Sequence, residues 1–201
     1  MADIRIAVDG ATSFPEGVTP FSRLQGAVKP RPGDFYLTHQ KDNPWWKPAF
    51  AMIRLGQALR YKGEFRKYAH WNHAGIFVDD NGQVVEALNN GVVTRQISAY
   101  RAEEYTVVYL DMTDEDRTQV ANIAKQWVGA KYGWLNIVNI GMRIIFGGKL
   151  SYSRADEKIC SGLVAYCLTA AGYTWRGYDV NRMMPADLAW LASVDYEEAT
   201  K

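Results

Sequence analysis

Residues 158–168 read KICSGLVAYCL and place a cysteine at the start of an apolar segment. Apolar residues recur at helical spacing after Cys160, and Gly172 is a typical stop signal, so we expect a largely buried helix. The first turn of a helix carries free backbone N–H groups and the positive end of the helix dipole, which favour a thiolate. Cys160 is therefore a candidate nucleophile, with a small hydrophobic core residue as the alternative interpretation.

The second cysteine, Cys167, lies further along the same predicted helix. The helical rise between the two residues is about 10.5 Å, whereas a disulfide allows about 7 Å between Cα atoms. We therefore expect no disulfide between Cys160 and Cys167.

A β-hairpin is predicted where HAGIFV and QVVEAL flank the turn residues 79–82. His73 and Glu86 are the polar residues in these apolar strands. A two-residue turn late in the loop would place His73 opposite Asn90, with Glu86 about 13 Å along the strand. An earlier turn or a bulge would make His73 and Glu86 direct neighbours. The spacing leaves Glu86 and Asn90 as alternative partners of the histidine.

Further elements follow from periodicity and capping signals. Thr113 precedes an acidic first turn, as an N-cap residue does, and Pro185 suits the first turn of a helix. The expected strands are 4–8, 35–38 and 105–110, and the expected helices are 44–61, 114–128, 134–146 and 185–192. We expect the helix after Thr113 to bury Val120, Ile123, Ala124, Trp127 and Val128.

Composition excludes several classes of protein. The 201 residues suit one domain, and the net charge of +1 with no recognisable motif gives no reason to expect a nucleic-acid partner. No apolar run is long enough for a transmembrane segment, and MADIRIAVDG does not resemble a secretory signal. We expect synthesis in the cytoplasm, and neither a metal nor a cofactor.

Two segments before the hairpin suit ligand contacts. The tryptophans Trp45 and Trp46 suit the wall of a substrate groove, although aromatic pairs more often pack in a core. A basic run suits an anionic polymer or a lipid headgroup, although such runs are more often solvated faces. The run consists of Arg54, Arg60, Lys62, Arg66 and Lys67.

Four motifs together resemble the NlpC family of papain-like cysteine peptidases. CSGLVAYCLTAAG resembles the nucleophile helix of that family, and HAGIFVDDNGQVVEA resembles its histidine strand and the strand after it. GAKYGW is similar to its tyrosine segment and PGDFYL to its Gly-Asp strand. Here His73 and Glu86 precede Cys160, which is the order of the circularly permuted branch, related to the lecithin:retinol acyltransferase-like enzymes. Ile159 stands where the family usually has aspartate.

The resemblance implies an α+β fold in which an antiparallel sheet carrying the histidine packs against the nucleophile helix. It implies an N-terminal arm at 1–29 and a permuted catalytic domain at 30–201, in which 39–70 is a helical insertion that the family does not match.

The same resemblance assigns roles to individual residues. It places the nucleophile at Cys160, the general base at His73 and the orienting group at Glu86, with Asn90 in reserve. Tyr132 is expected to line the site.

Three functions are compatible with these motifs. The CSGLV form favours an endopeptidase or amidase that cuts the stem peptides of peptidoglycan. The first alternative is a thioesterase or acyltransferase on lipid or acyl-peptide substrates, with Trp45, Trp46 and 134–146 as an acyl-chain groove. The second is a structural assembly module of a larger particle. A wall-cutting enzyme without a signal peptide reaches the wall by another route, such as a phage tail or phage lysis, with phage structural proteins as partners.

Overall fold

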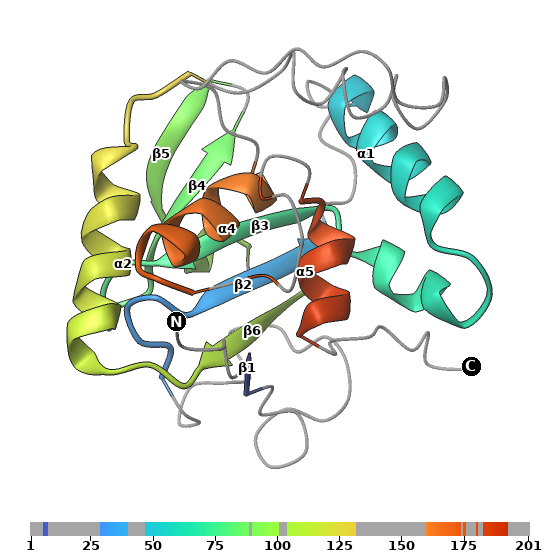
Figure 1. Ribbon diagram of the computed structural model, residues 1–201. Helices are drawn as coiled ribbons and strands as arrows, with labels where there is room; N and C mark the ends of the chain where they lie inside the picture. Colours follow the sequence, from blue (N-terminus) through green and yellow to red (C-terminus); the bar gives the residue numbers. More distant parts are fainter. Residues whose placement is uncertain are drawn as a thin grey trace.

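The computed structural model describes residues 6–7, 29–39, 47–88, 90–100, 104–131, 160–173, 175, 180 and 183–192. Its centre is a six-stranded antiparallel sheet with the strand order β1-β6-β2-β3-β4-β5 (Figure 1). The strands are β1 (Ile6–Ala7), β2 (Phe35–His39), β3 (His73–Phe77), β4 (Gln83–Leu88), β5 (Gly91–Gln96) and β6 (Glu104–Leu110).

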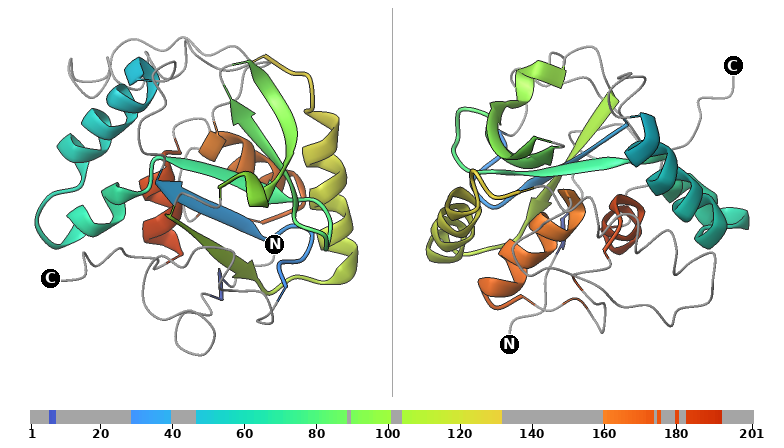
Figure 2. Two further views of the ribbon diagram at one scale, coloured as in Figure 1. Left: turned by 180° about the vertical axis from the view of Figure 1, so that it is seen from behind. Right: turned by 90° about the horizontal axis from the view of Figure 1, so that it is seen from above.

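Helices surround this sheet. The α-helices are α1 (Lys47–Arg60), α2 (Asp114–Gln126), α4 (Cys160–Ala170) and α5 (Pro185–Leu191), and the 3-10 helices are η3 (Gly63–His70) and η4 (Ile97–Tyr100). Helices α2, α4 and α5 cover one face of the sheet, whereas η4 lies against the other (Figure 2). The expected α+β class with an antiparallel sheet is confirmed.

The two faces of the sheet have different cores, as the alternation of side chains along a strand requires. On the helix face, Leu37 and Ile76 pack with Leu163 of α4 in a large aliphatic cluster. The opposite face is smaller and aromatic. Its buried members are Tyr36, Phe77, Val84, Ile97, Tyr100, Tyr105, Val107 and Tyr109.

Most expected elements occur, with shifted ends. The helix after Thr113 is confirmed, and the Thr113 hydroxyl accepts a hydrogen bond from the Asp116 N–H at 3.1 Å. The prediction that Val128 is buried is wrong, because the helix ends at Gln126 and Val128 is 45% exposed in the turn that follows. Strand β5 was not predicted. The expected helix at 134–146 lies outside the described residues.

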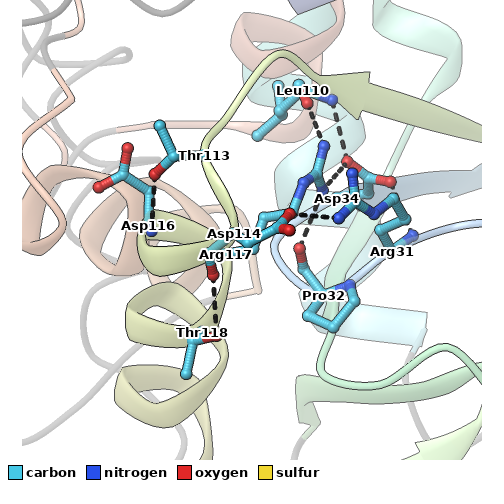
Figure 3. Close-up of polar contacts among 9 residues, drawn as sticks. All are labelled: Arg31, Pro32, Asp34, Leu110, Thr113, Asp114, Asp116, Arg117 and Thr118. Atoms are coloured by element: carbon cyan, nitrogen blue, oxygen red, sulfur yellow. Dashed lines mark hydrogen bonds and ion pairs between the residues drawn. The ribbon is translucent and has the colours of Figure 1, made fainter.

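A buried ion pair fastens the start of β2 to β6 and α2 (Figure 3). Arg117 Nη1 donates to Asp34 Oδ1 at 2.9 Å and to the Pro32 carbonyl at 3.0 Å, and its Nη2 donates to the Leu110 carbonyl. Asp34 Oδ1 also accepts from the Leu110 N–H at 2.9 Å. Burial raises the pKa of Asp34. The backbone hydrogen bonds and the hydrogen bond and charge of Arg117 offset part of this rise. This pair fixes the position of β2 in the centre of the sheet.

Helix α1 and η3 lie beyond the end of the sheet at which β3 begins (Figure 1). The buried Gln57 ties them together, because its Nε2 donates to the carbonyls of Ala69 at 3.2 Å and Trp71 at 2.8 Å. Its Oε1 accepts from the Ala186 N–H of α5 at 3.0 Å. One side chain therefore joins α1, η3 and α5.

Candidate active site

The register of the hairpin sets the relation between His73 and Glu86. Gly75 lies opposite Glu86, so His73 is the diagonal neighbour of Glu86 on the same face. Both registers expected from the sequence are wrong, because Val78 N–H donates to the Gln83 carbonyl at 2.9 Å and residues 79–82 all lie in the loop. A diagonal pair in a sheet remains within reach of long side chains. The expected contact between His73 and Glu86 is therefore confirmed, by a different register.

Three donors converge on one oxygen of Glu86. His73 Nε2 lies 2.5 Å from Glu86 Oε2, the Tyr36 hydroxyl donates to the same oxygen at 2.7 Å, and the Tyr100 hydroxyl donates to it as well. The Tyr36 and Tyr100 rings are 5.6 Å apart between centroids, and each lies 6.2 Å from the His73 ring. Aromatic rings thus enclose the His73–Glu86 pair.

Glu86 is held as an anion. Its burial opposes ionisation, but the hydrogen bonds and charge of His73, and then the bonds from Tyr100 and Tyr36, outweigh burial and lower the pKa of Glu86. Arg95 Nη1 lies 3.7 Å from the other oxygen, Oε1, and the Arg95 guanidinium lies 5.4 Å from the centroid of the Tyr100 ring. The carboxylate is therefore charged and fixed, as an orienting group for a histidine must be.

Cys160 contacts the other side of the histidine. Burial lowers the pKa of His73, but the charge and hydrogen bond of Cys160 and the hydrogen bond and charge of Glu86 together raise that pKa to about 10. Glu86 occupies Nε2 of the ring, which leaves Nδ1 for the thiol. At neutral pH, His73 is an imidazolium that lies between the carboxylate of Glu86 and the sulfur of Cys160.

The first turn of α4 positions the sulfur. Cys160 is the first residue of the helix and is only 1% exposed, and Ser161 Oγ donates to the Met183 carbonyl at 2.6 Å. Helix α4 packs against β3 and β4, the strands that carry His73 and Glu86. No disulfide joins Cys160 to Cys167, and Cys167 is buried about two turns further along α4.

Gly75 allows the tyrosine to reach the carboxylate. It lies between Tyr36 of β2 and Glu86 of β4 in one row across the sheet. A Cβ at Gly75 would lie 2.5 Å from Tyr36 Cε1 and 2.7 Å from its hydroxyl oxygen, closer than real Cβ contacts. The Tyr36 ring therefore crosses over β3 only because residue 75 has no side chain.

Of the other expected site residues, the structure describes only Asn90. Asn90 is exposed in the turn between β4 and β5, so it does not share the buried site of His73. Tyr132, Trp45 and Trp46 lie outside the described residues.

Sequence reasoning missed Tyr36, Tyr100, Gly75 and Arg95. Tyr36 was visible in the sequence as the tyrosine of PGDFYL. Its contact with the site follows only from the pairing of β2 with β3.

Among the described residues, no group of histidine, cysteine and acidic side chains could hold a metal ion. Within the same part of the chain, no helix has the length and apolar character needed to cross a membrane. No protein-family model matches the sequence, and no curated protein matches it significantly.

Proposed function

We propose that this protein is a cysteine hydrolase with a circularly permuted papain-like fold. The observation that carries the proposal is a buried series of contacts: Cys160 contacts His73, and His73 contacts an ionised Glu86. An isolated core cysteine does not need a charged histidine partner, and burying two charges costs free energy unless they are paired. A nucleophile, base and orienting group in this order is the arrangement that thiol hydrolases use.

The first chemical step is acylation. The Cys160 thiolate attacks the carbonyl carbon, and the negative charge moves to the carbonyl oxygen, where the backbone N–H of Cys160 at the start of α4 is a suitable donor. The His73 imidazolium gives its proton to the leaving amine, so the amine departs neutral and a thioester forms on Cys160.

Deacylation reverses the role of the histidine. A thioester carries no charge on sulfur, so the contribution of Cys160 to the raised pKa of His73 disappears while the penalty of burial remains. The neutral imidazole then accepts a proton from water, and the hydroxide equivalent attacks the thioester and releases the acid. Glu86 stabilises the imidazolium that forms.

The substrate that we propose is the stem peptide of peptidoglycan, cut by endopeptidase or amidase action. The support is the CSGLV form of the nucleophile segment, which resembles wall-cutting members of the NlpC family. A role as a phage virion or lysis component accounts for delivery to the wall.

The test is mass spectrometry of soluble fragments after the protein is incubated with purified sacculi of several chemotypes. Cys160→Ala removes the nucleophile, and Cys167→Ala is the matched control because it removes a buried thiol from the same helix. We expect fragments from the wild type and from Cys167→Ala, and none from Cys160→Ala. Absence of fragments from every wall would contradict the peptidase, and Cys160-dependent cleavage of acyl thioesters instead would identify an acyl hydrolase.

A further inference from the structure

A basic cavity of about 660 Å³ lies outside the Cys160–His73–Glu86 row. Three elements form it: the end of β2, the second half of α1, and η3. Its polar lining consists of His39, Arg54, Arg66, Lys67 and His70, and its remaining lining residues are alanines.

Cations line this cavity together with histidines and alanines, and no acidic residue lines it. Within the described part of the chain, neither Arg54 nor Arg66 forms an ion pair with a carboxylate. Both arginines are exposed to solvent. Cations that face one hollow repel each other, and an anion between them relieves that repulsion. Three residues of the basic run, Arg54, Arg66 and Lys67, therefore line one hollow.

Hydrogen bonds and a stacked pair of rings hold the walls of the cavity. Since a carbonyl can only accept, His39 Nδ1 donates to the His70 carbonyl, at 2.6 Å. The two imidazole rings stack with their centroids 4.2 Å apart and 18° between their planes. Gln57 joins α1 to the segment after η3 through the Trp71 carbonyl. The cationic side chains thus project from a rigid frame, which lowers the cost of ordering them around a ligand.

We propose that this cavity binds the phosphate group of a phosphate ester. The lining cations come from two elements, α1 and η3, and the histidines from the ends of β2 and η3. A tetrahedral phosphate presents acceptor oxygens to several directions at once, whereas a planar carboxylate presents two in one plane. The volume lies in the range of about 300–1,000 Å³ that suits a small molecule, so it holds more than the phosphate alone.

The cavity and the candidate active site lie at the same end of the sheet. Thr38 lies opposite His73, and His39 is the next residue of β2. A phosphate ester held here would lie at the end of the sheet where β3 begins. The proposal does not depend on hydrolysis, because it concerns binding by side chains other than Cys160, His73 and Glu86.

The experiment is isothermal titration calorimetry of the full chain with glycerol 3-phosphate, with inorganic phosphate and with acetate, at equal ionic strength. Arg54→Gln and Arg66→Gln each remove one cation from the cavity. Lys62→Gln is the matched control, because Lys62 belongs to the same basic run and lies outside the lining. Cys160→Ala separates binding from catalysis.

We expect saturable binding of both phosphates at one site, weakened about tenfold by Arg54→Gln or Arg66→Gln and unchanged by Lys62→Gln and Cys160→Ala. Absence of saturable binding, equal binding of acetate, or equal weakening by Lys62→Gln would overturn the proposal. Sedimentation with vesicles of phosphatidate, but not of phosphatidylcholine alone, identifies the ester as a lipid headgroup. Phosphate binding without sedimentation identifies a soluble ester.

Discussion

Substitution of Gly75 by alanine tests the row that connects β2, β3 and β4. Without a neighbour, this change would stabilise the fold by about 0.4–1 kcal/mol, because alanine restricts the unfolded chain. In this protein the new Cβ would lie 2.5 Å from Tyr36 Cε1 and 2.8 Å from Cζ. The Tyr36 ring is fully buried and packs edge-on against Phe77 and Tyr105, so it has little room to move.

The expected cost has two parts. Overpacking of a buried ring costs about 1–3 kcal/mol. Displacement of the ring breaks the 2.7 Å bond from the Tyr36 hydroxyl to Glu86, and loss of a hydrogen bond to a charged group costs about 1.5–3 kcal/mol. Alanine also restricts the unfolded chain, and this stabilisation of about 0.4–1 kcal/mol is subtracted from the cost. We therefore expect Gly75→Ala to lower the free energy of unfolding by about 3 kcal/mol.

Urea unfolding at pH 7, followed by tryptophan fluorescence, measures this change. Tyr36→Phe removes only the hydroxyl and should cost about 1.5–3 kcal/mol. In the double variant the hydrogen bond is lost once and not twice, so the two costs should be less than additive. A neutral or stabilising effect of Gly75→Ala, or full additivity with Tyr36→Phe, would refute the reasoning.

Other predictions concern the charges. In Cys160→Ala the pKa of His73, measured by nuclear magnetic resonance, should fall clearly below about 10, because Cys160 raises it; an unchanged value would contradict their contact. The folded pKa of His73 exceeds its ordinary value of 6.5, so its stabilising contribution is complete below about pH 6.5 and is lost as the pH rises through about 10. Glu86→Gln should flatten this decline in unfolding free energy, and an identical pH profile would be inconsistent with the ion pair. Arg117→Ala should cost about 3–5 kcal/mol by leaving a buried carboxylate without its cation, whereas Arg31→Ala, whose ion pair is exposed, should cost about 0–1 kcal/mol; equal costs would argue against the buried pair.

The sequence predicted the elements better than their pairing. The periodicity after Cys160, the Thr113 cap and the hairpin were all recognisable, because each depends on residues close together in the chain. The hairpin register was not, because it depends on how many of residues 79–82 the loop takes up. Asp79 Oδ1 accepts from the N–H groups of Asn81 and Gln83 at 2.9 and 2.8 Å, which stabilises a longer loop than either expected turn.

The candidate site was predicted only in part for a similar reason. His73 and Glu86 stand out in sequence because they are polar residues in apolar strands. Tyr36 and Tyr100 do not, because a tyrosine in or beside a strand is ordinary. Their hydroxyls meet Glu86 through pairing between β2 and β3 and through the fold of η4, which are contacts between distant parts of the chain.

The most direct test of the activated thiol is the rate at which iodoacetamide modifies each cysteine at pH 7, measured by peptide mass spectrometry. Cys160 and Cys167 are 1% and 0% exposed, so burial alone predicts similar and slow labelling of both. Because His73 contacts Cys160, we predict that Cys160 reacts faster by about tenfold or more, and that His73→Gln removes most of this difference. Equal, slow labelling of the two cysteines in the wild type would contradict the account.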